Sequence, residues 1–274
     1  MGFGHGFTKT KLGFKRGFRT LVESGATGLV AYDPNSTPAG TQIAWYREDA
    51  TNDGSGNINP WIDKWTGNDQ SQTTVANRPN IVATDPVFNN FQSYQWNGTS
   101  DVTLSPASTE GNFVAMNNGT GFLVWAVFTA TSASVSQYMM GTANTSTETG
   151  FRMLYNGTAE RMSFHIANGS TDVVAVTLPD GIVPLNTQIR LVFWIKDGLA
   201  PGNEIECIIN DVTRLQGTVT GTFSASNPTR RLTLGRAPGS ATLFFTGKYA
   251  EIGIITDVTV AANVALYLKN RYSP

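Results

Sequence analysis

Two carboxylates stand two residues apart in the segment Glu204-Ile205-Glu206, where they could act as a pair of acids. Retaining hydrolysis of a glycosidic bond needs two carboxyl groups about 5 Å apart across that bond. A strand motif of this kind would carry its second catalytic acid four residues further on, and that position holds Asn210, which cannot act as an acid or a base. We therefore interpret Glu204 and Glu206 as part of a solvated strand face. The chain also lacks a Gly-x-Ser-x-Gly motif and a phosphate-binding loop, and we expect it not to be an enzyme.

Six tryptophans could offer flat apolar surface for stacking against a sugar ring. Trp125 and Trp194 lie in strongly apolar segments, which favours a place in the core. Trp45, Trp61 and Trp65 flank a loop rich in Asp and Gly. These three either pack against a sheet edge or face a ligand, and we keep them as candidate glycan-binding residues.

The loop between them, residues 49–57, has the oxygen-bearing side chains that calcium prefers. An EF-hand would need Asp or Asn at its third position and Glu at its twelfth, where this chain has Thr51 and Pro60. A plain turn-rich loop and an irregular calcium site both stay open. With one cysteine, Cys207, and two histidines, an intrachain disulfide is excluded and a tetrahedral zinc site is disfavoured. We expect no cofactor and assign no metal site.

Most of the chain alternates short apolar segments with turn residues, which predicts strands. Asn-Gly pairs begin at residues 97, 118, 156 and 168, and Asn-Gly favours the type I′ turn of tight hairpins. The segment Gly121–Ala130 is apolar on both faces, which predicts a central strand covered by two layers. The other predicted strands are Phe91–Trp96, Ser100–Leu104, Gly150–Tyr155, Ala159–Ile166, Thr171–Leu178, Gln188–Lys196, Glu204–Asn210, Val212–Val219, Arg231–Gly235 and Thr242–Ile255.

A single helix is predicted near the C-terminus. Thr259 can cap it, and Lys269 and Arg271 in its last turn favour the helix dipole. Its apolar face is formed by Val260, Val264, Tyr267 and Leu268. Many strands with one terminal helix indicate an all-β fold with two packed antiparallel sheets, a sandwich or jelly roll.

Charge separates a basic N-terminal arm from a mildly acidic body. Residues 1–22 contain five basic residues and no acid, whereas the whole chain has a formal net charge of −1. That net charge excludes a globally basic nucleic-acid-binding protein. No apolar run reaches 18 residues, so we expect no membrane-spanning helix. The first 18 residues lack the apolar stretch of a signal peptide, and we expect assembly in the cytoplasm of the producing cell.

The arm repeats the dipeptide Gly-Phe, and glycine at this density cannot sustain a helix or strand. We interpret residues 1–27 as a docking arm whose phenylalanines enter pockets on a partner while its cations lie on acidic surface. A frayed terminus and a short nucleic-acid-binding segment are the two alternatives, and nucleic acid is the less favoured. The predicted docking residues are Phe3, Phe7, Phe14, Phe18, Lys9, Lys11, Lys15, Arg16 and Arg19.

An ordered set of motifs resembles concanavalin A-like, laminin-G-type domains of bacterial and phage proteins. Its first half is Ala44-Trp45-Tyr46, Asp53-Gly54-Ser55-Gly56-Asn57, Trp61-Ile62-Asp63-Lys64-Trp65, Asn77-Arg78-Pro79 and Tyr94–Gly98. Its second half is Ile189–Lys196, Glu204–Asp211, Gly247–Ile255 and Tyr267–Tyr272. The resemblance covers residues 28–274 and implies a concanavalin A-like jelly roll, preceded by the extended arm of residues 1–27. It fixes no function, since such sandwiches bind glycans, bind proteins or only build structures.

Arm and body together indicate a non-enzymatic structural or adhesive protein of a phage particle, such as a head or tail fibre or a capsid decoration. In this hypothesis the arm docks on other virion proteins, and the lectin-like domain faces outward, where it could bind glycans of the host surface. We expect a homo-oligomer located in the virion, with no membrane partner. The alternative is a secreted bacterial carbohydrate-binding module or a glycanase-related protein.

Overall fold

Strand β5 (Phe122–Ala130) is the centre of the fold, and all nine of its residues are buried. The computed structural model describes residues 29–134 and 136–273. The even-numbered side chains of β5 belong to the core between two sheets, whereas Leu123, Trp125 and Val127 belong to a second core under helix α1 (Ala261–Tyr272). The prediction of a central strand that is apolar on both faces is confirmed.

The sheet that contains β5 has eight strands in the order β12-β11-β10-β5-β14-β3-β2, and β1 also pairs with β14. Strand β14 (Thr246–Ile255) is long enough to pair along one edge with β3 near its start and with β1 near its end. The remaining strands of this sheet are β1 (Gln42–Tyr46), β2 (Asn80–Val82), β3 (Ser93–Asn97), β10 (Ile189–Ile195), β11 (Ile205–Ile209) and β12 (Val212–Gly217).

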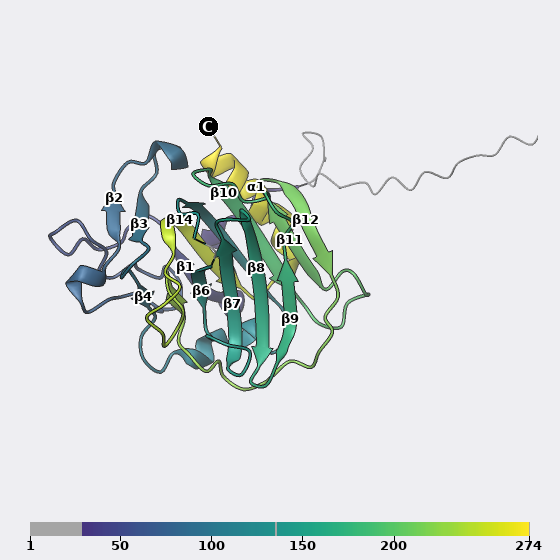
Figure 1. Ribbon diagram of the computed structural model, residues 1–274. Helices are drawn as coiled ribbons and strands as arrows, with labels where there is room; N and C mark the ends of the chain where they lie inside the picture. Colours follow the sequence, from purple (N-terminus) through teal and green to yellow (C-terminus); the bar gives the residue numbers. More distant parts are fainter. Residues whose placement is uncertain (1–28, 135, 274) are drawn as a thin grey trace, which may run out of the picture.

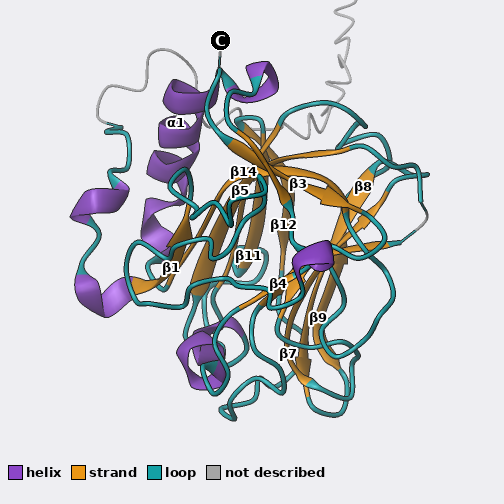
Figure 2. Ribbon diagram, turned by 90° about the vertical axis from the view of Figure 1, so that its left-hand side faces the viewer, coloured by secondary structure: helices purple, strands orange, loops and turns teal. Residues whose placement is uncertain are grey.

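The second sheet has six strands in the order β4-β13-β6-β7-β8-β9, and all strand pairs in both sheets are antiparallel. The two sheets pack face to face, with α1 on the outer side of the larger one (Figures 1 and 2). Phe164 and Phe193 stack across the interface with ring centroids 4.1 Å apart. The strands of this sheet are β4 (Thr103–Leu104), β6 (Gln137–Gly141), β7 (Thr149–Asn156), β8 (Arg161–Asn168), β9 (Asp172–Thr177) and β13 (Thr233–Leu234).

The predicted two-sheet jelly-roll sandwich with one short C-terminal helix is therefore confirmed, but several elements differ. The sequence analysis does not predict β1, β2 or β6. Strands β1 and β6 are buried with almost no alternation of polar and apolar residues, and β2 has only three residues. The predicted strands Ser100–Leu104 and Arg231–Gly235 shorten to the two-residue strands β4 and β13. Short 3₁₀ helices fill the connections: η1 (Pro34–Ser36), η2 (Ala39–Thr41), η3 (Val75–Asn77), η4 (Pro86–Phe88), η5 (Glu110–Met116) and η6 (Val258–Val260).

The hairpin positions agree with the Asn-Gly pairs at 156 and 168, but the turn type does not. The Asn156 side chain accepts a hydrogen bond from Ala159 N (3.0 Å), and Asn168 accepts one from Thr171 N (3.1 Å). These Asn side chains thus close the turns themselves. Positive φ at two successive residues, as a type I′ turn requires, occurs instead at Asn210 (47°) and Asp211 (68°), between β11 and β12.

Helix α1 follows η6, and the predicted cap is wrong by two residues. Asp257, not Thr259, caps η6, because its carboxylate accepts hydrogen bonds from the backbone N–H and the hydroxyl of Thr259 (3.0 and 2.6 Å), and α1 itself begins after Val260 without a side-chain cap. Lys269 and Arg271 do lie in the last turn. Among the described helices none is both long enough and apolar enough to cross a membrane.

Candidate functional site

The three candidate tryptophans occupy different environments. Trp61 is fully buried between the sheets, with its ring centroid 4.6 Å from that of Tyr94. Trp45 is 2% exposed, and its ring lies 5.3 Å from that of Trp65, which is partly exposed. The structure therefore brings Trp45 and Trp65 together, leaves only Trp65 partly exposed, and places Trp61 in the core between the sheets.

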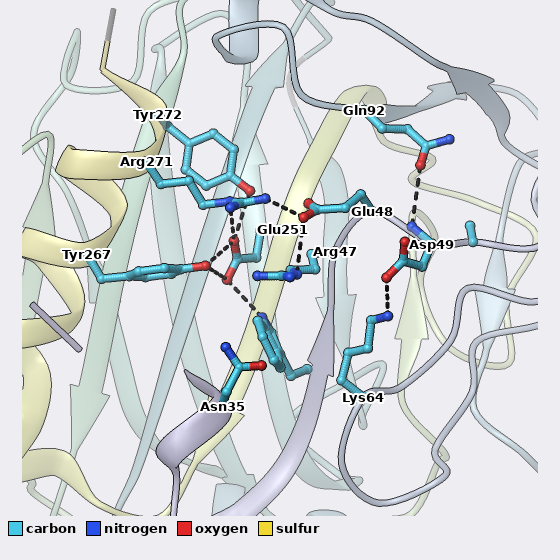
Figure 3. Close-up of polar contacts among 12 residues, drawn as sticks. Asn35, Arg47, Glu48, Asp49, Lys64, Gln92, Glu251, Tyr267, Arg271 and Tyr272 are labelled. Atoms are coloured by element: carbon cyan, nitrogen blue, oxygen red, sulfur yellow. Dashed lines mark hydrogen bonds and ion pairs between the residues drawn. The ribbon is translucent and has the colours of Figure 1, made fainter. Parts of the chain in front are cut away.

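Trp45 and Trp65 border a hollow of about 370 Å³ outside the eight-stranded sheet. The guanidinium of Arg47 lies over the Trp45 ring, 4.6 Å from its centroid, and the Lys64 ammonium pairs with Asp49 (Figure 3). The full lining comprises Asn35, Gln42, Trp45, Arg47, Lys64 and Trp65, contributed by η1, β1 and the loop that follows Trp61.

One buried carboxylate fixes the loop that carries Trp65. Asp63 Oδ1 accepts hydrogen bonds from the backbone N–H groups of Trp45 (2.9 Å) and Trp65 (3.0 Å). Its Oδ2 accepts one from Asn68 N (2.9 Å). Because the same side chain holds both tryptophan backbones, it sets the relative position of the two rings.

Behind the hollow lies Glu251, a fully buried carboxylate on β14 that the sequence analysis missed. Burial raises the pKa of the Glu251 carboxyl, and its hydrogen bonds and the nearby Arg271 oppose that shift. A single acid within the apolar run of β14 was the signal that could have found it. Its oxygens accept hydrogen bonds from Tyr267 OH (3.0 Å) and Tyr272 OH (2.8 Å), which Figure 3 shows. They also accept hydrogen bonds from the indole Nε1 of Trp45 and of Trp125, both at 2.9 Å.

This network attaches α1 to the sheet and orients Trp45 from its buried side. Arg271 extends it outward, since its guanidinium pairs with Glu48 (Figure 3). The same guanidinium lies 3.9 Å from the centroid of the Phe91 ring. The hollow itself contains an aromatic face, two cations and two amides, and no carboxyl, hydroxyl or thiol group lines it among the described residues. Such a lining can bind a polar ligand but offers no acid–base pair for hydrolysis.

The loop 49–57 uses its oxygen atoms internally. Asp53 accepts hydrogen bonds from Ser55 N (2.8 Å) and Arg78 Nη1 (3.0 Å), and these hydrogen bonds lower the pKa of the Asp53 carboxyl. Asn52 likewise accepts from Gly54 N (2.8 Å). Within residues 29–134 and 136–273, no group of three or more His, Cys, Asp or Glu side chains is placed to hold a metal ion.

The interpretation of Glu204 and Glu206 as a solvated face is wrong for Glu204, which is buried, whereas Glu206 is partly exposed. Glu204 is 6% exposed and accepts hydrogen bonds from Val219 N (2.8 Å) and Gly198 N (3.2 Å). Glu206 accepts hydrogen bonds from the Trp194 indole and the Thr213 hydroxyl, both at 3.0 Å. The chain on either side of β11 folds over these carboxylates, which the local sequence does not reveal. Their partners show two structural carboxylates.

All nine predicted docking residues of the arm, from Phe3 to Arg19, fall outside the described residues. The division into residues 1–27 and 28–274 therefore stays a prediction.

No protein-family model and no curated protein matches the chain. Several solved structures, in contrast, match the chain. Trypanosoma rangeli sialidase in complex with 2,3-difluorosialic acid has a TM-score of 0.55 at 12% identity, over 85% of this chain and 34% of the sialidase. The CBM40 of the Ruminococcus gnavus IT-sialidase, bound to α2,3-sialyllactose, has a TM-score of 0.50 at 12% identity, over 64% of this chain and 95% of that domain.

A third similar structure is the binding domain of botulinum neurotoxin serotype D, with a TM-score of 0.57 at 4% identity, over 85% of this chain and 51% of the toxin domain. The chain spans about a third of the length of the sialidase. These likenesses establish the fold. At such low identity they carry no residue assignments, and the two-sheet jelly-roll fold is what they share with this chain.

Proposed function

We propose that this chain is a non-enzymatic glycan-binding domain whose ligand occupies the hollow beside Trp45 and Trp65. The observation that carries the proposal is the partly exposed Trp65 ring next to the cations Arg47 and Lys64. Sugars combine an apolar ring face with hydroxyl groups, and a tryptophan beside amide and cationic donors complements both. The sialyllactose bound to the R. gnavus domain supports a saccharide ligand for a sandwich of this shape.

We further propose that the domain is displayed on a phage particle, as a head or tail fibre or decoration, and is held by residues 1–27. The Gly-Phe repeats and five cations of the arm support docking on other virion proteins. The fold is equally consistent with the alternative, a carbohydrate-binding module of a secreted bacterial protein. Removal of residues 1–22 separates the two, because only the virion hypothesis requires that incorporation into particles is lost while the melting temperature of the body is unchanged.

A glycan array followed by calorimetric titration of the best saccharide tests the binding function. Trp65→Ala should weaken binding at least about tenfold, since a buried aromatic contact contributes more than 1 kcal/mol. Trp194→Ala is the matched control, because Trp194 is also partly exposed but lies on β10. Absence of any array signal, or equal losses in both variants, would contradict the proposal. The bound saccharide should be recovered intact after prolonged incubation.

A further inference from the structure

Two adjoining hollows lie around β4 and β13, at the edge of the six-stranded sheet. Their volumes are about 360 and 310 Å³, within the range of small-molecule sites. Both are lined by Leu104, Arg231 and Arg236, so that they form one continuous groove. This groove shares no lining residue with the hollow beside Trp45 and Trp65.

Arg236 is a partly buried cation without an opposite charge. Its Nε is buried and makes no hydrogen bond to any described residue. No carboxylate in the described part of the chain pairs with it, and this uncompensated burial lowers the pKa of its guanidinium. Burying a charge costs free energy unless an opposite charge pairs with it. An anionic ligand that paired with Arg236 would therefore offset this cost.

Arg231 reinforces the same demand. Its Nη1 donates to the carbonyl of Ser105 (3.2 Å), and among residues 29–134 and 136–273 it too has no carboxylate partner. The neighbouring Arg230 behaves differently, because two of its nitrogens donate to Glu148 (3.0 and 2.6 Å). Arg230 therefore has a carboxylate partner, whereas the nearby Arg231 and Arg236 have none in the described part of the chain.

Besides Arg231 and Arg236, the groove contains one further cation, Arg230, which is paired with Glu148. Glu110 is the only carboxylate that lines the groove, and it lies in the first hollow. Hydroxyl and amide groups dominate the second hollow, where they can bond to sugar hydroxyls: Ser71, Gln72, Thr73, Thr74 and Asn77. An anion with hydroxyl groups attached to it fits both halves.

We propose that this groove is a second binding site, for an acidic saccharide whose carboxylate or sulfate ester lies between Arg231 and Arg236. Guanidinium groups bind such planar or multi-oxygen anions through paired hydrogen bonds. The polar side chains of the 71–77 loop bond to the hydroxyl groups of the same sugar. The site stands apart from the glycan hollow, and either can fail without the other.

The test uses the full chain and three related probes: lactose, α2,3-sialyllactose and sulfated lactose. Titrations are run with the natural chain and with Trp65→Ala, so that binding in the glycan hollow is separated from binding here. In the Trp65→Ala background we expect both acidic sugars to bind at least tenfold more tightly than lactose, and less tightly as salt is raised. The two acidic probes distinguish a carboxylate from a sulfate ester.

Arg236→Gln and Arg231→Gln should each weaken binding of the acidic sugars at least tenfold, and Arg236→Lys should restore part of it. Arg161→Gln is the control, because Arg161 is an arginine paired with Asp180 elsewhere on the sheet. Equal affinity for lactose and acidic sugars, or full affinity in Arg236→Gln, would overturn the proposal. So would a change of association state on sedimentation of Arg236→Gln, which would assign these arginines to a contact between copies.

Discussion

Glu251 and Arg236 are both charged side chains removed from water, and their surroundings are opposite. Glu251 is fully buried and accepts hydrogen bonds from two indoles and two tyrosine hydroxyls. Arg236 is partly buried and makes no hydrogen bond to the described chain. The first charge is satisfied by the fold and attaches the helix to the sheet. The second charge has no partner in the described chain and is available to a ligand.

This contrast separates charges that hold the structure from charges available to a ligand. Removing a fully partnered buried charge leaves its donors unsatisfied, whereas removing an unpartnered one relieves a desolvation cost. Substitutions at the two kinds of site should therefore affect stability very differently, and the following predictions test this in order of expected size.

Glu251→Ala should lower the free energy of unfolding by at least about 3 kcal/mol, because four donors lose their acceptor and three of them, Trp45, Trp125 and Tyr272, are buried. Chemical denaturation monitored by tryptophan fluorescence measures this. Glu251→Gln keeps one oxygen for the indoles and should cost less. A loss below about 1 kcal/mol in the alanine variant would remove the basis of the contrast.

Glu204→Gln should cost about 1–2 kcal/mol, because the new amide N–H group faces a backbone N–H of Gly198 or Val219 instead of accepting from it. Asp180→Asn is the control, since the Asp180 carboxylate is exposed and pairs with the Arg161 guanidinium. The same denaturation experiment applies. An unchanged free energy of unfolding in Glu204→Gln would instead favour the solvated strand face predicted from the sequence.

Asp101 is an intermediate case, a buried carboxylate with few donors: it accepts from Asn97 N at 2.9 Å. Burial raises the pKa of Asp101 to about 6. A folded-state pKa above the unfolded value of about 3.9 makes protonation favour the folded protein, so its ionisation costs stability as pH rises from about 4 to about 6. Asp101→Asn should therefore be about 1–2 kcal/mol more stable than the natural chain at pH 7 and not at pH 4. The same difference in free energy of unfolding between Asp101→Asn and the natural chain at pH 7 and at pH 4 would contradict this prediction.

Arg236→Ala should change the free energy of unfolding by less than about 1 kcal/mol, because it removes no described hydrogen bond and only a long contact with the Phe244 ring (5.9 Å to its centroid). Thermal unfolding without ligand measures this change in stability, and thermal unfolding with an acidic sugar measures stabilisation by the ligand. In the Trp65→Ala background, which removes binding in the other hollow, the chain with Arg236 should gain stability from the ligand and the chain with Arg236→Ala should not. A loss comparable to that of Glu251→Ala would show that Arg236 is structural.

Local pattern was enough to predict the fold where burial follows sequence. The apolar run of β5 predicted a strand with two covered faces, and the turn residues around β7, β8 and β9 predicted a meander of hairpins. Strand β6, with the sequence QYMMG, gave no such signal, since it is wholly buried and rich in methionine. Its place depends on neighbours distant in the chain.

The site was harder to predict because it depends on long-range contacts. Trp61 and Trp65 are four residues apart, yet the loop held by Asp63 sends one into the core and leaves the other partly exposed. The lack of a carboxylate partner for Arg236 cannot be predicted from the sequence, because most carboxylates that pair with other arginines are distant in the chain, as in Arg230 and Glu148, 82 residues apart.

The most direct test of glycan binding at Trp65 is ¹⁹F NMR of protein labelled with 5-fluorotryptophan, with six tryptophan signals assigned by single Trp→Phe variants. On addition of the saccharide selected by the array, the Trp65 signal should shift most and the Trp45 signal less, since Trp45 lies behind it in the same hollow. Trp61 and Trp194 should not move. An unshifted Trp65 at saturating saccharide, or a shift confined to Trp194, would contradict the account.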